Sequence, residues 1–359
     1  MKAQSVALVT GSSSGIGFET ALLLARNGFN TYASMRNLGK SKDITQIASK
    51  EKLPLQVIQL DVNDDRSAKD AVDKIIEENQ RIDVLVNNAG YGLLGSLEDL
   101  SIEEIKAQFE TNFFGVVRVT QQVLPVMRKQ KNGTIVNISS VGGRMSFPGL
   151  SAYHSTKFAL EGLSESISYE LEPFGIRVVI IEPGFVRTNI MNSSIIAKKA
   201  QDPKSPYFSL IQQLDRSFKS AMENTSASSP PEEVAKVILE AVTSESPKLR
   251  YAVSNDAEVI LFTNSSFFKL RYLLLFSMSA RVAVTISSSL TFLSICAGNT
   301  RISSLFDRLK ILLCKVLYSN VANSSALSLR SGLPILSTNK VSPVNSSLFP
   351  TKNEMPPSV

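Results

Sequence analysis

Tyr153 and Lys157 stand four residues apart in the sequence YHSTK, a spacing that can support proton transfer. Residues at positions i and i+4 share one face of a helix. A lysine ammonium beside a phenol favours the phenolate, so it lowers the phenol's pKa from its usual value of about 10. Such a phenol can act as acid or base near neutral pH. The same spacing also arises by chance on ordinary helices, so the pair needs support from the rest of the chain.

A glycine-rich loop near the N-terminus provides that support. The apolar run SVALVT (5–10) leads into GSSSGIG (11–17), and apolar residues at helical spacing follow as far as Asn27-Gly28. A strand, a glycine-rich turn and a helix N-terminus let backbone N–H groups approach a pyrophosphate closely. The spacing departs from GxGxxG, because three residues separate the first two glycines. A plain tight turn is the alternative interpretation.

The elements around these residues alternate between strands and helices. Apolar, β-prone runs predict strands near 5–10, 30–35, 55–60, 83–87, 133–139, 176–182 and 249–253, with helical patterns between them. This order predicts an α/β fold with a doubly wound parallel sheet of the Rossmann type, in a single domain. A chain of 359 residues with 43% hydrophobic content is long enough for one large core.

The TGxxxGxG form of the loop is similar to that of the short-chain dehydrogenase/reductase family. The resemblance continues in chain order through Asp61-Val62, the sequence NNAG (87–90), Asn112, Ser140, YHSTK, and Pro183-Gly184 followed by Val186 and Thr188. It covers residues from about 4 to about 255. The stretches YASMRNL, YGLLGSLEDL and YHSTKFALEGL are most similar to the branch that contains 17β-hydroxysteroid and retinol dehydrogenases.

The resemblance implies a catalytic set of Asn112, Ser140, Tyr153 and Lys157. Ser140 and Tyr153 are expected to bind the substrate oxygen, and Tyr153 to transfer the proton. Lys157 is expected to bind the nicotinamide ribose and to lower the pKa of Tyr153, while Asn112 holds a water. The residues expected to bind the cofactor are Gly11, Ser13, Ser14, Gly15, Ile16, Gly17, Arg36, Asp61, Val62, Asn88, Ala89, Gly90, Tyr153, Lys157, Pro183, Gly184, Val186 and Thr188.

Cofactor choice depends on the residue that follows the second strand. An acidic residue there binds a ribose 2′-hydroxyl, whereas a basic one accommodates a 2′-phosphate. The strand here ends Ala33-Ser34-Met35-Arg36 without a carboxylate, and an arginine can grip a phosphate bidentately. The sequence therefore predicts NADP(H), with NAD(H) as the alternative. A solvated arginine without a role is the other interpretation.

Other polar residues at strand ends allow two interpretations each. Asp61 is placed to accept from an adenine amine, or it belongs to the turn before a helix that Asp64 caps. The asparagines of NNAG are placed to join neighbouring strands and line a ribose, or they serve simple turn chemistry. The single histidine, His154, is interpreted as incidental, because adjacent helix positions face different ways. No Cys/His cluster suggests a metal site.

The chain changes character near residue 262, so we expect a domain over residues 1–261 and an atypical tail over 262–359. The tail carries ten Lys and Arg against two acidic residues, and about one-fifth of it is serine. A membrane segment over 282–298, an added lid or partner-binding segment, and a frameshifted reading of the gene are the three interpretations. We favour the third. No signal peptide is evident in MKAQSVALVTG, so a cytoplasmic location is expected, with membrane association through 282–298 as the alternative.

These observations predict an NAD(P)-dependent oxidoreductase that interconverts a carbonyl and an alcohol. A non-catalytic dinucleotide-binding or sensing protein on the same fold is the alternative. The segment 189–230 is expected to act as a substrate lid, and relatives lead us to expect a homodimer or homotetramer. No nucleic-acid partner is expected, because the basic tail lacks a recognisable module. A mostly apolar small-molecule substrate is expected from the pocket candidates Leu93, Gly142, Arg144, Phe147 and Phe185.

Overall fold

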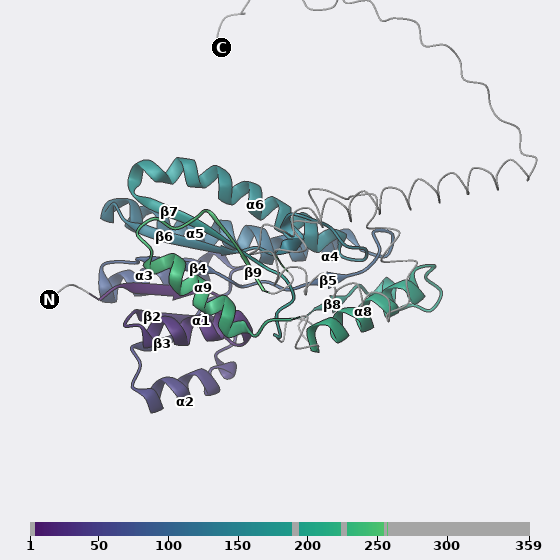
Figure 1. Ribbon diagram of the computed structural model, residues 1–359, viewed down its shortest axis with the longest axis horizontal. Coiled ribbons are helices and arrows are strands. Elements are labelled where there is room, and N and C mark those ends of the chain that lie inside the picture. Colours follow the sequence, from purple (N-terminus) through teal and green to yellow (C-terminus); the bar gives the residue numbers. More distant parts are fainter. Residues whose placement is uncertain (1–3, 189–193, 224–227, 255–256, 258–359) are drawn as a thin grey trace, which may run out of the picture. The chain divides into compact units, whose positions relative to one another are not determined.

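A seven-stranded, all-parallel sheet forms the centre of the protein (Figure 1). The computed structural model describes residues 4–188, 194–223, 228–254 and 257. The strand order is β3-β2-β1-β4-β6-β7-β9, so the chain winds outward from β1 in both directions. The strands are β1 (Val6–Val9), β2 (Asn30–Met35), β3 (Leu55–Gln59), β4 (Val84–Asn87), β6 (Gly133–Ile138), β7 (Ile176–Pro183) and β9 (Arg250–Val253). All seven predicted strands and the doubly wound fold class are confirmed.

Helices cover both faces of the sheet (Figure 1). The main helices are α1 (Gly15–Arg26), α2 (Lys42–Glu51), α3 (Asp65–Asn79), α4 (Ile102–Phe109), α5 (Gly115–Gln130), α6 (Ser151–Leu171), α8 (Phe208–Glu223) and α9 (Pro231–Thr243). A π-helical turn, Glu110–Phe114, joins α4 to α5. Short 3₁₀ turns lie at Leu38–Lys40, Val141–Gly143, Glu172–Phe174 and Lys199–Gln201.

Two apolar clusters form because successive strand residues point to opposite faces of the sheet. Leu8 packs on one face with Val72 of α3 and Val123 of α5. Ala7 and Val9 pack on the other face with residues of α1, α2 and α9. The strands are therefore buried on both sides, which explains why their sequences are continuously apolar.

A second parallel sheet, of two strands, lies outside the central sheet and was not predicted. It joins β5 (Leu93–Leu94) to β8 (Ile195–Ile196). Two-residue strands leave no periodic pattern in the sequence. Gly95 extends this region, because its N–H donates to the carbonyl of Gly149, 2.8 Å away.

The predicted tail, residues 262–359, lies outside the described residues, as does the candidate membrane segment 282–298. Among the helices of the described part of the chain, none is long and apolar enough to cross a membrane. The interpretations of the tail therefore stay predictions.

Candidate active site

Helix α6 brings Tyr153 and Lys157 to the carboxyl ends of the central strands. Lys157 is buried, with 8% of its surface exposed, and its Nζ donates to the carbonyl oxygen of Ile138 at 2.8 Å. The same Nζ lies 5.8 Å from the centre of the Tyr153 ring. The helix spacing thus places both side chains on one face, as the sequence predicted.

Burial shifts the pKa of both members of the pair. Burial raises the pKa of Tyr153, and a hydrogen bond with Ser140 opposes that rise. Burial lowers the pKa of Lys157 to about 8, although the charge of Glu161 acts in the opposite direction. Burial is thus the larger of the two effects on the pKa of Tyr153, and the lowering expected from Lys157 stays a prediction.

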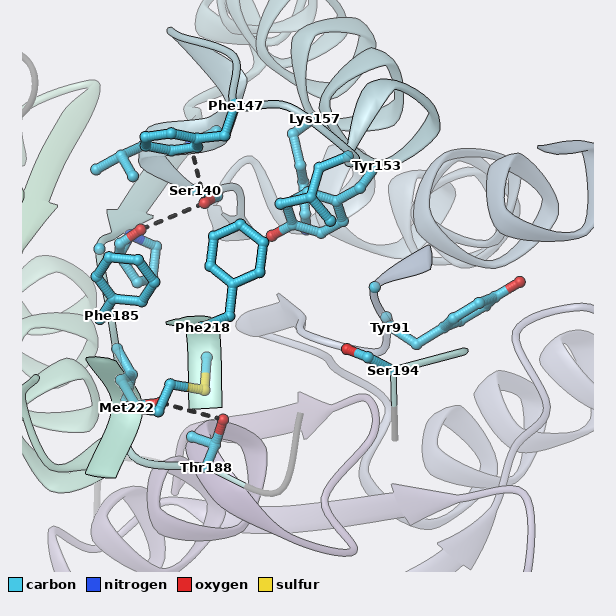
Figure 2. Close-up of a pocket in the computed structure, with 18 of the residues that line it drawn as sticks. Tyr91, Ser140, Phe147, Tyr153, Lys157, Phe185, Thr188, Ser194, Phe218 and Met222 are labelled. Atoms are coloured by element: carbon cyan, nitrogen blue, oxygen red, sulfur yellow. Dashed lines mark hydrogen bonds between the residues drawn. The ribbon is translucent and has the colours of Figure 1, made fainter. Parts of the chain in front are cut away.

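Ser140 begins the turn that follows β6. Its Oγ accepts from the N–H of Gly142 at 3.0 Å and donates to the carbonyl oxygen of Pro183 at 3.4 Å. Its backbone is extended, and the 3₁₀ turn Val141–Gly143 starts directly after it. The hydroxyl is therefore fixed between the end of β6 and the end of β7, close to Tyr153 (Figure 2).

His154 has a structural role, so its interpretation as incidental is wrong. It is buried, with Nδ1 2.8 Å from the carbonyl oxygen of Gly142 and Nε2 accepting from the N–H of Phe147 at 2.9 Å. Because Nε2 accepts, the hydrogen lies on Nδ1, and burial lowers the pKa of His154. The loop after Ser140 folds over the start of α6, so it meets His154, whose ring also lies edge-on to that of Tyr153, with 5.7 Å between the ring centres.

Asn112 lies in the π-helical turn between α4 and α5 and is buried. Its amide oxygen accepts from the N–H of Tyr91 at 3.0 Å, while its Nδ2 donates to the carbonyl of Tyr91 at 2.9 Å and to Thr156 Oγ1 at 3.2 Å. The polar side chain is paired at a point where the helix ladder is irregular. Asn112 therefore ties the β4–α4 connection to α6.

The glycine-rich loop is held by Asn88. The Nδ2 of Asn88 donates to the carbonyl oxygens of Thr10 at 2.9 Å and Gly11 at 3.1 Å. Gly11 and Gly15 have φ of +69° and +62°, a region that favours glycine. A Cβ on Gly17 would lie 2.3 Å from Asn88 Nδ2, and one on Gly15 would lie 3.1 Å from Thr188. These contacts form a close-fitting cradle at the N-terminus of α1, which suits a dinucleotide pyrophosphate.

Two other predicted cofactor residues lie at strand ends. Arg36 directly follows β2 and is exposed, and its charge lowers the pKa of Tyr91 against the rise caused by burial.

Asp61 follows β3, where its carboxylate accepts from the N–H of Asn63 at 3.0 Å. Asp64 caps α3 by accepting from the N–H of Ser67. Val62 is buried, and a Cβ on Gly115 would lie 2.9 Å from its Cβ.

The end of β7 closes the site opposite the glycine-rich loop. The N–H of Gly184 donates to the carbonyl of Val253 at 3.0 Å, which fixes this strand end against β9. Val186 forms an isolated parallel bridge with Ser229. Thr188 Oγ1 donates to the carbonyl of Val186 at 3.5 Å.

One pocket of about 230 Å³ brings many of these residues together (Figure 2). Ser140, Tyr153 and Lys157 line it together with seven predicted cofactor residues: Ile16, Asn88, Gly90, Pro183, Gly184, Val186 and Thr188. The predicted residues that do not line it are Gly11, Ser13, Ser14, Gly15, Gly17, Arg36, Asp61, Val62, Ala89 and Asn112.

The apolar part of the pocket corrects two predicted substrate contacts. Gly142, Phe147 and Phe185 line it, but Leu93 and Arg144 do not. Side chains alternate along a strand, so Leu94 faces the pocket while Leu93 is buried in the core. Arg144 instead pairs with Glu182 at 3.0 Å.

Helix α8 supplies pocket residues that sequence reasoning missed. Phe218 and Met222 line the pocket, and the rings of Phe218 and Phe185 lie 6.4 Å apart. Phe218 and Met222 lie four residues apart on an amphipathic helix, and this spacing is the sequence pattern that could have identified them. Part of the predicted lid segment therefore borders the site, and residues 189–193 and 224–227 lie outside the description. The other missed lining residues include Tyr91, Leu150, His154, Ser194, Ile196, Asp215 and Lys219.

Comparison with known proteins agrees with this architecture. Residues 5–199 match the short chain dehydrogenase family. The chain is 36% identical to human (Homo sapiens) 17-beta-hydroxysteroid dehydrogenase type 1 over 69% of this chain and 77% of the relative. It is 39% identical to retinol dehydrogenase 8 of Bos taurus over 68% and 79%. The resemblance to this branch is confirmed.

Two solved structures share the fold. A short-chain dehydrogenase from Streptomyces avermitilis is 33% identical with a TM-score of 0.65, over 76% of this chain and 98% of that one. A short-chain dehydrogenase/reductase from Burkholderia phymatum in complex with NAD is 22% identical with a TM-score of 0.65, over 75% and 95%.

A doubly wound sheet with a glycine-rich loop at its carboxyl edge is the architecture of dinucleotide-binding oxidoreductases. With the family match over residues 5–199 and relatives more than one-third identical, the chain belongs to the short-chain dehydrogenase family.

Proposed function

We propose that the protein is an NADP(H)-dependent oxidoreductase that interconverts a carbonyl and an alcohol. The observation that carries this proposal is the shared pocket, in which Ser140, Tyr153 and Lys157 line the same cavity as seven of the predicted cofactor residues. A hydride donor bound across the strand ends would then reach the substrate carbon. A proton donor on α6 would reach the oxygen bonded to that carbon.

Tyr153 is proposed to protonate the substrate oxygen during carbonyl reduction, with Ser140 donating a hydrogen bond to the same oxygen. Because burial raises the pKa of Tyr153, the phenol is protonated at neutral pH, as a proton donor must be. Bound NADPH supplies the hydride.

Lys157 is proposed to bind the ribose hydroxyls next to the nicotinamide. Its ammonium is buried beside Tyr153 and anchored on the carbonyl of Ile138. A positive charge at this position would also stabilise negative charge that develops on the phenol oxygen. Asn112 is proposed to act by holding the Tyr91 segment and α6 in place, together with a water.

The cradle at the N-terminus of α1 is proposed to bind the pyrophosphate. Gly15 and Gly17 leave the space that side chains would fill, and Ser13 and Ser14 stand beside them. Asp61 and Val62 would bind the adenine, Asn88, Ala89 and Gly90 the ribose, and Val186 and Thr188 the carboxamide.

Arg36 supports NADP(H) over NAD(H). It stands at the end of β2, where NAD-binding relatives of this fold class place an acidic residue, and its charge reaches as far as Tyr91 at the pocket. A guanidinium there would pair with a 2′-phosphate. The structure from Burkholderia phymatum binds NAD, so the choice between the cofactors needs a direct test.

The substrate is proposed to be largely apolar. Leu94, Phe147, Phe185, Phe218 and Met222 give the pocket a large apolar surface. Similarity to a hydroxysteroid dehydrogenase and a retinol dehydrogenase supports apolar carbonyl compounds as candidates.

A second copy of the chain is proposed to bind against α5 and α6. Phe114, at the end of the π-helical turn before α5, exposes 48% of its surface, and Phe158 and Tyr169 of α6 expose 46% and 67%. Exposed aromatics on neighbouring helices favour an interface. Equilibrium sedimentation should show a dimer or tetramer, and a monomer at micromolar concentration would contradict the proposal.

The experiment that tests the function measures NADPH and NADH oxidation with a panel of steroid ketones, retinal and smaller aldehydes. Turnover with NADPH is expected for at least one apolar carbonyl. Tight NADPH binding without turnover across the panel would favour a dinucleotide-binding protein instead.

A further inference from the structure

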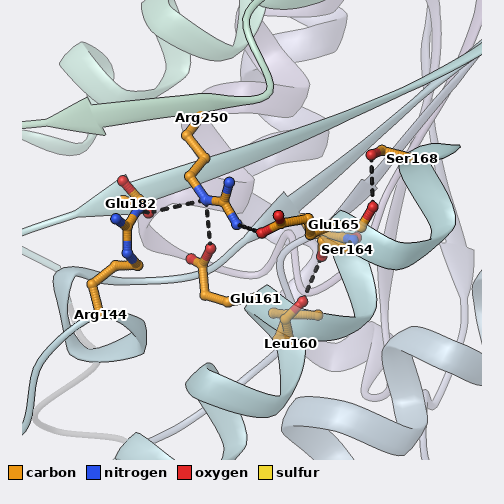
Figure 3. Close-up of polar contacts among 9 residues, drawn as sticks. Arg144, Leu160, Glu161, Ser164, Glu165, Ser168, Glu182 and Arg250 are labelled. Atoms are coloured by element: carbon orange, nitrogen blue, oxygen red, sulfur yellow. Dashed lines mark hydrogen bonds and ion pairs between the residues drawn. The ribbon is translucent and has the colours of Figure 1, made fainter.

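Five charged side chains from α6, β7, β9 and the loop after β6 form a cluster (Figure 3). We call Arg144, Glu161, Glu165, Glu182 and Arg250 the Arg250 cluster. Arg250 of β9 pairs through Nε with Glu161 at 3.0 Å and through Nη2 with Glu165 at 2.6 Å. Its Nε also lies 3.7 Å from Glu182 of β7, which pairs with Arg144 at 3.0 Å.

Two carboxylates of the cluster are buried. Glu161 exposes 5% and Glu182 exposes 3% of its surface. Removing a carboxylate from water is costly unless cations and hydrogen bonds compensate. The two arginines provide that compensation, yet Oε1 of Glu161 has no hydrogen-bond partner within the described part of the chain. A buried carboxylate oxygen without a partner keeps its charge unscreened by a hydrogen bond, so it can act on charged groups nearby.

Glu161 is connected to the active site in two ways. It lies four residues after Lys157, one turn along α6, and its negative charge raises the pKa of Lys157 against the effect of burial. It also contacts the loop that carries Ser140, because a Cβ on Gly143 would lie 2.9 Å from Glu161 Cγ and 3.1 Å from the carbonyl oxygen of Lys157.

We propose that Glu161 is a positioning residue that keeps Lys157 protonated while Arg250 holds the Glu161 carboxylate in place. The inference rests on the proposed function, in that Lys157 is the residue taken to bind the cofactor. A buried lysine otherwise loses its proton easily, since burial disfavours the ammonium. Glu161 supplies the opposing charge from inside the protein, where water does not screen it.

Charged or titratable side chains lie on α6 and on the elements close to it. Tyr153 and Glu161 belong to α6, Glu182 to β7 and Arg250 to β9, and Arg144 comes from the loop after Ser140. Among these groups, Glu161 stands one turn from Lys157 on α6, and its charge raises the pKa of Lys157 against the larger effect of burial.

The test measures the titration of Lys157 by NMR in protein labelled with carbon-13 at lysine Cε. The signal is assigned by its loss in Lys157→Arg. The wild-type midpoint is expected near the value of about 8. Glu161→Gln should lower that midpoint by about one pH unit or more, as loss of a nearby opposite charge does.

Two variants control for structural effects. Glu165→Gln breaks another pair of Arg250 but lies a further turn from Lys157, so the midpoint should move by less than about 0.3 unit. Glu161→Asp keeps the charge and should restore most of the shift. An unchanged midpoint in Glu161→Gln, or an equal shift in Glu165→Gln, would overturn the proposal.

Arg250→Gln provides an independent arm if Glu161→Gln does not fold. It removes the side chain that holds the Glu161 carboxylate in place, so the Lys157 midpoint should fall, and an unchanged or raised midpoint would overturn the proposal. NADPH affinity is followed by fluorescence from pH 6 to pH 10. As the pH rises, this affinity should begin to fall at a lower pH in Glu161→Gln than in the wild type. If the wild type fails to bind NADPH at any pH, the proposed function fails, while the NMR titration still decides the role of Glu161.

Discussion

The Nζ atom of Lys157 lies over the ring of Tyr153, 5.8 Å from its centre. The ammonium therefore faces the π electrons of the ring, and its hydrogen bond goes to the carbonyl of Ile138. Burial raises the pKa of Tyr153 and lowers that of Lys157. The site thus holds a neutral phenol beside a lysine that loses its proton near pH 8.

The pH dependence of reduction follows from this arrangement. The pKa of Lys157 is about 8, so the lysine is charged below that pH and neutral above it. We expect kcat/KM for NADPH-dependent reduction to fall as the pH rises through about 8. Lys157→Arg stays charged throughout, so its lower activity should not fall in that range. A wild-type profile that rises through pH 8 would contradict this assignment.

Replacing Lys157 with methionine should stabilise the protein at pH 7. A folded-state pKa of about 8 against 10.5 corresponds to a cost of about 3 kcal/mol at 1.36 kcal/mol per unit. Loss of the hydrogen bond to Ile138 offsets about 1–2 kcal/mol of this gain. The unfolded lysine binds more protons between these two pKa values, so wild-type stability rises with pH there.

Urea unfolding of Lys157→Met at pH 7 and pH 9.5 measures this effect. The gain in free energy of unfolding should be larger at pH 7 and shrink at the higher pH. A variant less stable than the wild type at pH 7 would show that the ammonium is not costly to bury.

Arg36 should determine the choice between the two cofactors. Arg36→Asp removes the proposed 2′-phosphate partner and supplies an acceptor for a 2′-hydroxyl. Loss of a charge-assisted pair costs about 1.5–3 kcal/mol, so kcat/KM with NADPH should fall roughly 10- to 100-fold, while NADH use improves. Lys40→Glu removes an exposed cation near the same strand end. This control should leave the ratio of kcat/KM with NADPH to kcat/KM with NADH nearly unchanged. Equal ratios in both variants would contradict the role of Arg36.

Gly17 should be essential to the cradle. A Cβ there would lie 2.3 Å from Asn88 Nδ2 and 2.6 Å from the carbonyl oxygen of Gly11, so Gly17→Ala must displace Asn88 from the loop. We expect NADPH affinity to fall roughly tenfold or more, because overpacking of this kind costs about 1–3 kcal/mol.

Gly162→Ala is the matched control for that substitution. Gly162 lies on α6, and a Cβ there meets nothing within 4 Å. NADPH affinity should stay unchanged while the free energy of unfolding rises by about 0.5–1 kcal/mol. Titration calorimetry measures the NADPH affinity of both variants. Undiminished affinity in Gly17→Ala would mean that the loop does not bind the pyrophosphate.

The sequence predicted the central sheet because its strands are buried on both faces and are therefore continuously apolar. Pocket residues were harder to predict. Leu93 and Leu94 cannot be distinguished until the register of β5 is known, and Phe218 becomes a pocket residue only because α8 folds back over the site. The pairing of Glu161 with Arg250 joins residues far apart in the chain, which no local pattern reveals.

The most direct test of the central claim follows deuterium into the product from NADPH that carries deuterium in place of both hydrogens at the nicotinamide C4. With an apolar carbonyl that the wild type reduces, mass spectrometry should find the deuterium on the new alcohol carbon. Tyr153→Phe should bind NADPH with similar affinity but transfer at a rate at least about a hundredfold lower, as expected for loss of a general acid. Equal transfer by Tyr153→Phe, or product without deuterium, would contradict the account.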